Sequence, residues 1–369
     1  MKILYVTTIG GTMSFFTEHI KMLKDKGYVV DLACNTKSPV RREILDLDVK
    51  VHNICFSRNP FSVDNFRAYK DLKKLVAKGE YDIVHCHTPN AAAITRFACR
   101  KLRKKGLKII YTAHGFDFYK GAPLKNWTIF YPIEWICAHW TDTLITINKE
   151  DYLLARKHMH VKKIEYIPGV GIDLKKFSPV DEINEEKRLS IGIPKNAKMI
   201  LSVGELNENK NHQIIVKALA QINNDNIHYV IAGEGNQKEN LFSMSKNLGI
   251  SDRVHLLGFR SDVAELYSVA DLYALPSIRE GLNVSIMEAM ASGLPVICSK
   301  IRGNVDLIDE SGGDLYNPLD CEEVKNAIET VFSKTYDERK EIGKYNAEKV
   351  YKFSDRVVLE QLKEIYNNL

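Results

Sequence analysis

The sequence predicts a doubly wound α/β protein of two domains, and two observations support this prediction. Short runs of β-branched and aromatic residues alternate with segments of helical periodicity along all 369 residues. Several of the short runs, such as 199–201 and 229–232, are continuously apolar, as expected for strands buried on both faces of a parallel sheet. Strands that alternate with helices through short loops are typical of the doubly wound α/β class.

The expected elements follow in order along the chain. Strands are predicted at 2–8, 29–35, 50–56, 83–87, 107–113, 143–148, 164–168, 199–204, 227–232, 254–258, 272–275, 295–299 and 313–316. Helices are predicted where apolar residues recur at three- and four-residue spacing, including 12–26, 65–78, 91–104 and 285–292. Each half of the chain therefore contains the elements of one Rossmann-like sheet.

The charge of the chain changes sign near residue 180. Residues 1–180 contain 30 Lys and Arg against 17 Asp and Glu, whereas the remaining residues contain 22 against 30. The segment 178–187 is polar, contains Pro179 and interrupts the alternation. We therefore expect one domain over 1–177 and a second over 178–353, with a C-terminal helix over 354–369 that packs back on the first. Ligand is expected in a cleft between the carboxyl ends of the two sets of strands.

Composition excludes several classes of protein. Hydrophobic residues make up 45% of the chain and charged residues 27%, which is ordinary for a folded globular protein. No apolar run reaches the ~20 residues that a membrane span needs, and the N-terminal apolar run is too short for a signal peptide. The seven cysteines are scattered and include no Cys-x-x-Cys, which indicates a reduced, cytoplasmic chain without a zinc ribbon.

The segment 277–297 carries the strongest functional signal. A predicted strand ends before Ser277, and a loop with Glu280 then precedes a helix that begins near Asn283. The unpaired N–H groups and the dipole at a helix start suit a phosphate. Glu288 lies about two turns further along, where it could accept hydrogen bonds from a hydroxyl pair such as a ribose. Two solvated helix carboxylates are the alternative interpretation.

Two features of the first half also point to a ligand. Gly10 and Gly11 follow the first predicted strand, where glycine lets the backbone approach a phosphate, although such a pair is usually only a turn. His114 ends a predicted strand and precedes a glycine, so its side chain could reach the cleft. A histidine packed in the core is the alternative.

The motifs of this chain resemble those of the family-4 retaining glycosyltransferases of the GT-B fold. The Glu-x7-Glu pair at 280 and 288 carries the resemblance, together with the segments 81–87, 113–115, 167–173, 203–212, 231–235 and 257–260. Bacterial exopolysaccharide and capsule glycosyltransferases look similar. The resemblance implies transfer of a hexose or N-acetylhexosamine from a UDP-sugar to a lipid-linked (polyprenyl-diphosphate) glycan, with retention of configuration.

The resemblance also implies roles for individual residues. It places Glu280 by the hydroxyls of the donor sugar, Glu288 at the ribose and His114 at the reaction centre. The diphosphate would be bound by Lys210, by Gly10 and Gly11, and by the backbone of Gly281, Leu282 and Asn283. The loop of Arg260 would bind the uracil.

The chain departs from the family at Glu205, where an arginine is usual. A carboxylate at this position would repel a diphosphate, so either Glu205 points elsewhere or the donor is held by one cation fewer. Arg279 and Arg302 are candidates to compensate. We expect Glu205 to pair with Lys210 or with another cation, because an unpaired carboxylate there would be costly.

No metal or other cofactor is expected. Asp46 and Asp48 spell the Asp-x-Asp of metal-dependent glycosyltransferases, but they lie between a helix and a strand at the sheet end opposite the expected cleft. His85 and His87 flank Cys86 on a strand, so the cysteine faces away from both and cannot share a metal with them. His87 could instead line an acceptor pocket.

Two features concern the acceptor and the membrane. Trp127, Tyr131 and Trp135 are spaced along one helical face, which either packs in the core or contacts lipid. The run 100–108 contains six cations, which favours an anionic membrane surface as a partner. Nucleic acid is not expected, because the basic run lacks a binding module. We therefore expect a peripheral protein on the inner face of the plasma membrane.

Two other functions remain open from the sequence. One is an enzyme like the UDP-N-acetylglucosamine 2-epimerases, which share a similar fold. The other is a non-catalytic subunit that binds a nucleotide sugar, an alternative that Glu205 favours.

Overall fold

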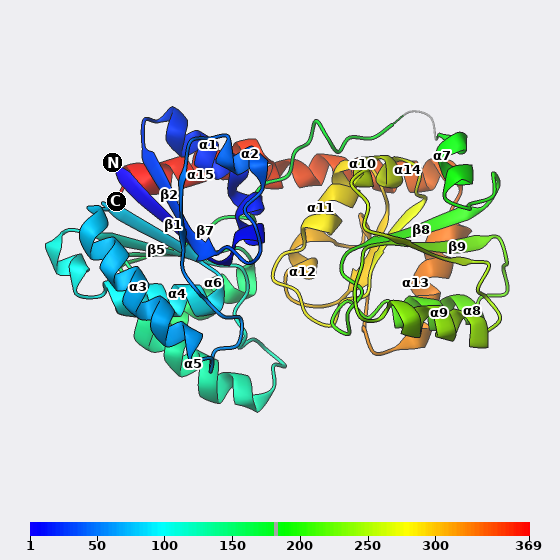
Figure 1. The fold of residues 1–369 in the computed structure, drawn as a ribbon. Coiled ribbons are helices and arrows are strands. Elements are labelled where there is room, and N and C mark those ends of the chain that lie inside the picture. Colours follow the sequence, from blue (N-terminus) through cyan, green and yellow to red (C-terminus); the bar gives the residue numbers. More distant parts are fainter. Residues whose placement is uncertain (181–183) are drawn as a thin grey trace. The chain divides into compact units, whose positions relative to one another are not determined.

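The computed structural model describes residues 1–180 and 184–369, which form two compact units (Figure 1). Unit 1 comprises Met1–Gly171 and Asp355–Leu369, and unit 2 comprises Ile172–Ser354. The units therefore divide a few residues before the boundary expected after residue 177. Residues 181–183, which belong to the expected linker, lie outside the described residues.

Unit 1 is built on a seven-stranded parallel sheet within the described residues. The strand order is β3-β2-β1-β4-β5-β6-β7. Each strand was expected from the sequence, although β3 ends at Asn53 rather than at residue 56. The bounds are β1 (Lys2–Ile9), β2 (Val29–Asn35), β3 (Lys50–Asn53), β4 (Ile83–His87), β5 (Lys108–Ala113), β6 (Thr143–Thr146) and β7 (Lys163–Tyr166).

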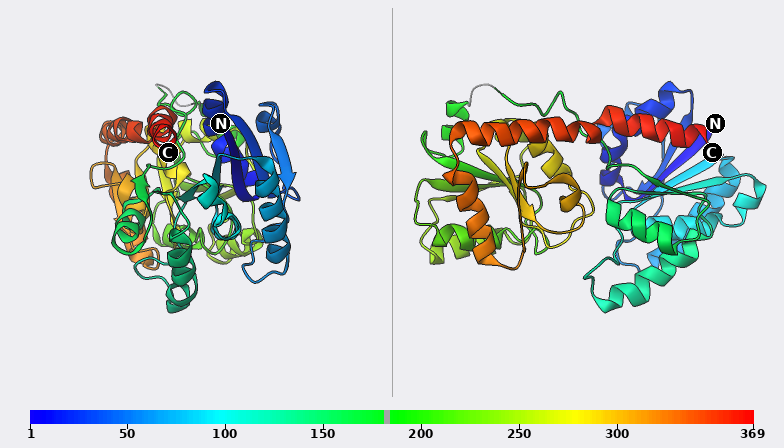
Figure 2. Two further views of the ribbon diagram at one scale, coloured as in Figure 1. Left: turned by 90° about the vertical axis from the view of Figure 1, so that its left-hand side faces the viewer. Right: turned by 180° about the vertical axis from the view of Figure 1, so that it is seen from behind.

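Helices cover both faces of this sheet. One face carries α1 (Thr17–Asp25), α2 (Arg42–Leu45) and α15 (Asp355–Asn367), and the other carries α3 (Asp64–Gly79), α4 (Pro89–Cys99), α5 (Leu124–Ala138) and α6 (Lys149–His158). Figure 2 shows α15, in red, on the same face as α1, in blue. Val358 and Leu362 of α15 share a core cluster with Ile3 of β1, so this burial makes the C-terminal helix part of unit 1.

Two helices of unit 1 differ from the prediction because 3-10 turns replace part of them. The predicted helix at 12–26 begins with a 3-10 segment at Gly10–Phe16, and the predicted helix at 91–104 ends at Cys99, with a 3-10 turn at Leu102–Lys105. Such turns are frequent at helix ends, where i→i+3 hydrogen bonds satisfy groups that a full α-helix would leave unpaired.

Unit 2 contains a six-stranded parallel sheet within the described residues, in the order β10-β9-β8-β11-β12-β13. Its strands are β8 (Lys198–Val203), β9 (Ile227–Ala232), β10 (Val254–Gly258), β11 (Leu272–Leu275), β12 (Val296–Ser299) and β13 (Gly313–Tyr316). Its helices are α7 (Glu185–Ser190), α8 (Gln213–Gln221), α9 (Lys238–Asn247), α10 (Val263–Ser268), α11 (Val284–Ala291), α12 (Asn304–Leu307), α13 (Cys321–Ser333) and α14 (Tyr336–Lys349), followed by a 3-10 turn at Val350–Phe353. Buried residues of α8, α9 and α13 form one core cluster with the strands, and α10, α11 and α14 lie over the other face (Figure 1).

In each sheet the chain first adds strands on one side of its first strand and then continues on the other side, so the strand order reverses once. In unit 1 the chain moves outward from β1 to β2 and β3, then returns to place β4 on the other side of β1. In unit 2 it moves from β8 to β9 and β10, then returns to place β11 beside β8. The loops after these strands diverge at the reversal and leave a crevice at the carboxyl edge, where ligands of such sheets bind. No helix among the described residues is long and apolar enough to span a bilayer.

Candidate active site

The start of α11 is tied firmly to the strand before it. The Asn283 side chain caps the helix by accepting hydrogen bonds from the backbone N–H groups of Ser285 (2.9 Å) and Ile286 (3.3 Å). The Ser285 hydroxyl also donates to Asn283, and it accepts from the Tyr273 hydroxyl of β11. The helix therefore begins at the position expected from the sequence, and its first turn is held at the carboxyl edge of the sheet.

Backbone N–H groups at this helix start are available to a ligand. Within the described part of the chain, no acceptor pairs with the N–H groups of Leu282, Asn283 or Val284. The backbone of Gly281 packs so closely on Gly303 that a Cβ atom at 303 would lie 2.0 Å from the Gly281 carbonyl oxygen. The loop after β12 thus supports the loop after β11, and the helix dipole adds partial positive charge at the open end.

Lys210 and Glu280 meet at the point where the strand order of unit 2 reverses. The Lys210 Nζ lies 2.7 Å from Glu280 Oε1, and both side chains are mostly buried. Asn207 positions the lysine by accepting from its backbone N–H, and Asn209 donates to the Arg279 carbonyl oxygen in the other loop. Because a lysine ammonium carries three N–H donors, Lys210 keeps two beyond its bond to Glu280.

Glu288 lies about one turn into α11, facing α10. Its carboxylate accepts a hydrogen bond of 2.8 Å from the Tyr267 hydroxyl. Burial raises the pKa of Glu288 to about 7, even though the Tyr267 bond and the nearby Lys176 charge both act to lower it. A hydroxyl that donates a hydrogen bond to the charged form of this carboxyl would stabilise that form and lower its pKa.

Glu205 does not make the ion pair that we expected. Its side chain is exposed, Lys210 is bound to Glu280 instead, and no cation in the described residues pairs with Glu205. The expectation was wrong because sequence proximity suggested the pair, whereas Lys210 reaches across to the loop that follows β11. An exposed carboxylate keeps its hydration, so it does not need a cationic partner.

Arginines contribute unequally to this edge of unit 2. Arg302 is buried, and its Nε donates to the Glu280 carbonyl oxygen (3.2 Å), so a second cation lies at the site. Arg279 is exposed in the loop after β11. Arg260, after β10, forms a two-pronged ion pair with Asp262. A ligand of this loop would therefore meet a neutralised pair rather than a free charge.

In unit 1, Gly10 and Gly11 stand where β1 ends and the strand order reverses. A Cβ atom on Gly10 would lie 2.3 Å from the Ser38 carbonyl oxygen, so only glycine fits there. The Gly11 N–H donates to the Ser38 hydroxyl (3.2 Å). A phosphate at Gly11 would have to displace this serine, which the sequence did not indicate.

His114, which is half-buried, adjoins a cluster of buried histidines at the carboxyl edge of unit 1. Its Nε2 lies 3.1 Å from Nδ1 of His87, which ends β4. Burial lowers the pKa of His114 to about 4, with His19 nearby, and burial also holds the pKa of His87 well below its usual value. Both rings are therefore neutral at neutral pH, where one donates and the other accepts.

The structure places the candidate metal ligands away from the carboxyl edges of both sheets. Asp46 and Asp48 lie between α2 and β3, at the amino edge of the sheet, and Asp48 is fully exposed with Lys24 at 3.8 Å. The described residues contain no group of three or more His, Cys, Asp or Glu side chains that could hold a metal ion.

The aromatic face predicted on α5 divides in two. Trp127 and Tyr131 pack against Phe118 in the core, with ring centroids 5.7 Å and 5.3 Å away, whereas Trp135 is exposed. At 3.6 residues per turn, a step of eight residues turns by about 80°, which carries Trp135 off the buried face.

Sequence reasoning missed two contacts at the edge of unit 1. Thr88 follows β4 with a φ of 63°, and its hydroxyl lies 2.8 Å from the hydroxyl of Thr8 in β1. It also accepts from the Thr8 backbone N–H. Threonines without a motif carry no signal in one sequence, so only the pairing of β1 with β4 could reveal this link.

Two family models match the chain: "Glycosyl transferase 4-like" over residues 2–148 and "Glycosyl transferases group 1" over residues 183–349. The putative glycosyltransferase EpsD of Bacillus subtilis (strain 168) is 35% identical over 99% of this chain and 96% of its own length. The UDP-Gal:alpha-D-GlcNAc-diphosphoundecaprenol alpha-1,3-galactosyltransferase of Escherichia coli is 29% identical over 87% of this chain and 84% of its own length.

A solved structure shares the whole fold. Anabaena Alr3699/HepE in complex with UDP-glucose superimposes with a TM-score of 0.83 at 19% identity, over all of both chains. The two Rossmann-like units therefore have the GT-B architecture. Together with the matches over both units, this shows that the chain belongs to the group 1 and 4-like glycosyltransferases and is a glycosyltransferase of the GT-B fold.

Proposed function

We propose that this enzyme transfers a hexose or N-acetylhexosamine from a UDP-sugar, with retention of configuration, to a polyprenyl-diphosphate-linked glycan during exopolysaccharide or capsule synthesis. The observation that carries the proposal is the Lys210–Glu280 pair beside the open start of α11. A cation and unpaired N–H groups suit a diphosphate, and the carboxylates of Glu280 and Glu288 suit the hydroxyls of a sugar and a ribose.

The relatives support the same donor and acceptor classes. The name of the E. coli relative specifies a UDP-galactose donor and a glycan linked to diphosphoundecaprenol. The HepE structure holds UDP-glucose. We carry the two classes, but not the particular sugars, over to this chain.

In the proposed reaction, the bond between the anomeric carbon and the diphosphate oxygen breaks, and its electron pair stays on the leaving diphosphate. Lys210 and the N–H groups of Leu282, Asn283 and Val284 stabilise that growing charge. The acceptor hydroxyl forms its bond on the same face of the sugar, and its proton passes to the departing diphosphate. This course retains the configuration.

We further propose that no divalent ion is needed. Lys210 and the helix start would supply the positive charge that a metal gives in other glycosyltransferases, while Asp46 and Asp48 lie at the amino edge of their sheet. The roles predicted for Gly10, Gly11, His114 and Arg260 stay predictions.

The acceptor's membrane is proposed to lie against α5 of unit 1. The outer side of this helix exposes apolar side chains, namely Leu124, Ile129, Ile133, Trp135 and Ile136. The basic run adjoins its C-terminal end, since Arg103 donates to the His139 carbonyl oxygen (2.8 Å). Apolar side chains beside cations are the combination that binds the surface of an anionic bilayer.

The first experiment incubates the full chain with labelled UDP-sugars and a short-chain polyprenyl-diphosphate-linked N-acetylglucosamine. We expect one UDP-sugar to yield an α-linked product at equal rates with EDTA and with Mg²⁺. Loss of activity in EDTA and its recovery with Mn²⁺ would contradict the proposal that no divalent ion is needed. Epimerised UDP-N-acetylglucosamine, or donor binding without turnover, would instead support one of the two alternative functions.

Glu288 should make donor binding depend on pH. If ribose hydroxyls donate to the Glu288 carboxylate, binding lowers its pKa from about 7. The Kd for UDP-glucose, which has no phosphate that titrates in this range, should then fall as pH rises from 5.5 to 7 and level off above. Glu288→Gln should flatten this profile and weaken binding by ~1–3 kcal/mol, measured by calorimetry. An identical profile in the variant would remove Glu288 from the ribose site.

Lys210 should act on turnover more than on binding, because the diphosphate charge grows as the sugar leaves. Lys210→Ala should lower kcat by ~10²–10³, with a smaller change in the donor KM. Lys217→Ala, which removes an exposed lysine of α8, is the matched control. A normal kcat with a raised donor KM would show that Lys210 binds the donor without assisting its cleavage.

The basic run should bind anionic lipid in a salt-dependent manner. Lys104→Glu together with Lys105→Glu should weaken sedimentation with phosphatidylglycerol vesicles by about tenfold or more, at ~1 kcal/mol for each cation. The same charge change at Lys340 and Lys344, on α14, serves as the control and should have little effect. Equal binding to neutral vesicles, or equal binding at 50 and 500 mM salt, would argue against this surface.

A further inference from the structure

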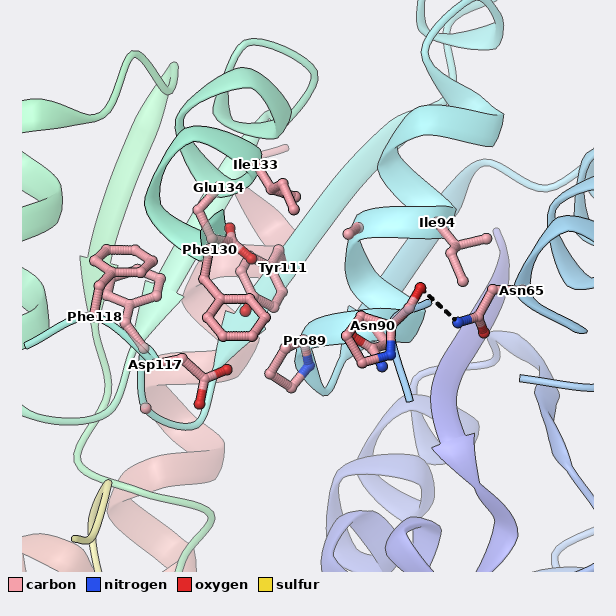
Figure 3. Close-up of a pocket in the computed structure, with 14 residues that line it drawn as sticks. Asn65, Pro89, Asn90, Ile94, Tyr111, Asp117, Phe118, Phe130, Ile133 and Glu134 are labelled. Atoms are coloured by element: carbon pink, nitrogen blue, oxygen red, sulfur yellow. Dashed lines mark hydrogen bonds between the residues drawn. The ribbon is translucent and has the colours of Figure 1, made fainter. Parts of the chain in front are cut away.

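An apolar cavity of about 140 Å³ opens between α4 and α5 in unit 1 (Figure 3). Ile94 of α4 lines one side, and Phe130 and Ile133 of α5 line the other. Tyr111 of β5 and Phe118, in the loop after β5, complete the apolar lining. The site described above uses none of these side chains, so the cavity needs an explanation of its own.

The Glu134 carboxylate in its lining is already neutralised. Glu134 lines the cavity, but both of its carboxylate oxygens accept from the Arg96 guanidinium at 2.8 Å. Arg96 is fully buried and lies over the Tyr111 ring, with its Cζ 4.1 Å from the ring centroid. A buried pair with every strong hydrogen bond satisfied leaves little charge at this part of the lining, and another charged side chain, Asp117, lines both this cavity and the next one. The cavity therefore selects for an apolar group.

A second cavity of about 270 Å³ continues the first toward the carboxyl edge of the sheet of unit 1. The two share the side chains of Pro60, Pro89, Asn90, Asp117 and Phe130.

The lining of this second cavity is polar at its far end. Thr8 and Thr12 lie there beside Thr88, at the point where the strand order of unit 1 reverses, and Arg58 adds a charged group. A ligand that filled both cavities would need a polar part at the carboxyl edge of the sheet and an apolar part beyond Phe130.

The apolar end leads to the surface assigned to the membrane. Ile133 lines the first cavity and is also 42% exposed on the outer side of α5, beside Ile129 and Ile136. The groove therefore runs from polar groups at the sheet edge, past an apolar cavity, to an apolar outer surface. This order matches an amphiphile whose hydrocarbon chain continues into a bilayer.

We propose that the cavity between α4 and α5 binds the first isoprenoid unit of the lipid-linked acceptor, while the acceptor's polar part lies in the adjoining cavity. This inference rests on the proposed function. The size is suitable, because an apolar cavity of roughly 150 Å³ accommodates a six-carbon benzene ring, and one isoprenoid unit has five carbons. Phe130 separates the polar part from the apolar part and acts as the anchor that recognises the lipid.

A binding experiment tests the cavity independently of turnover. Calorimetry with geranyl diphosphate should show binding at least about tenfold tighter than that of inorganic pyrophosphate. Phe130→Ala should remove most of this difference, as truncation of an aromatic anchor usually does. Ile133→Ser, at the exposed mouth, gives a second variant that leaves the core intact. Leu153→Ala, at an exposed position of α6 that lines neither cavity, is the matched control and should bind as the wild type does.

Transfer assays complete the test with two acceptors that carry the same diphosphate-linked glycan. They differ only in the alcohol joined to the diphosphate, which is a C10 isoprenol in one and ethanol in the other. The isoprenyl acceptor should show a lower KM in the wild type, Phe130→Ala should raise that KM by about tenfold, and the KM for the ethyl acceptor should not change. Equal binding of geranyl diphosphate and pyrophosphate would overturn the inference. It would also be overturned if neither Phe130→Ala nor Ile133→Ser changed the binding. An equal loss with both acceptors would assign the cavity to a sugar and also overturn it.

The two assays keep failure of this inference apart from failure of the proposed function. If no lipid-linked acceptor is glycosylated, the proposed function fails, whatever geranyl diphosphate does. If transfer occurs but the alcohol makes no difference to KM, only the isoprenoid site fails.

Discussion

Parallel strand pairing is the constraint on which both units depend. It brings the carboxyl end of every strand in a sheet to one edge, so loops far apart in the sequence begin side by side. In unit 2, the loops after β8, β11 and β12 supply Lys210, Glu280 and Arg302 to that edge. In unit 1, the ends of β1 and β4 supply Thr8 and Thr88. The reversal of strand order then opens these loops to a ligand.

The ion pair between Lys210 and Glu280 limits how unit 2 can hold an anion. The pair is mostly buried, so loss of either partner would leave a charge with poor solvation. Glu280 thus holds the ammonium in place before any ligand arrives, and it leaves two N–H donors for that ligand. This arrangement also explains why Glu205 is tolerated in this chain, because its exposed carboxylate does not compete for the lysine.

Burial has a different effect in each unit. In unit 2 it leaves the Glu288 carboxyl near its titration point at neutral pH, so a hydroxyl ligand can stabilise the charged form. In unit 1 it keeps His87 and His114 neutral, which suits them to hydrogen bonding rather than to charge stabilisation. It also makes the Arg96–Glu134 pair a tight link between α4 and α5, at the wall of the apolar cavity.

The sequence by itself determined the order and type of the elements, because buried parallel strands need continuous apolar runs and surface helices need a 3.6-residue period. It also placed Glu280, Asn283 and Glu288 around one helix start, since these residues are local to each other. Only the tertiary structure decided that Lys210 pairs with Glu280 and not with Glu205, that Ser38 occupies the Gly11 N–H, and that Trp135 turns outward from Trp127. The first two depend on loops that strand order brings together, and the third depends on how far the helix turns between the two tryptophans relative to the core. Such contacts leave no periodic signal in one sequence.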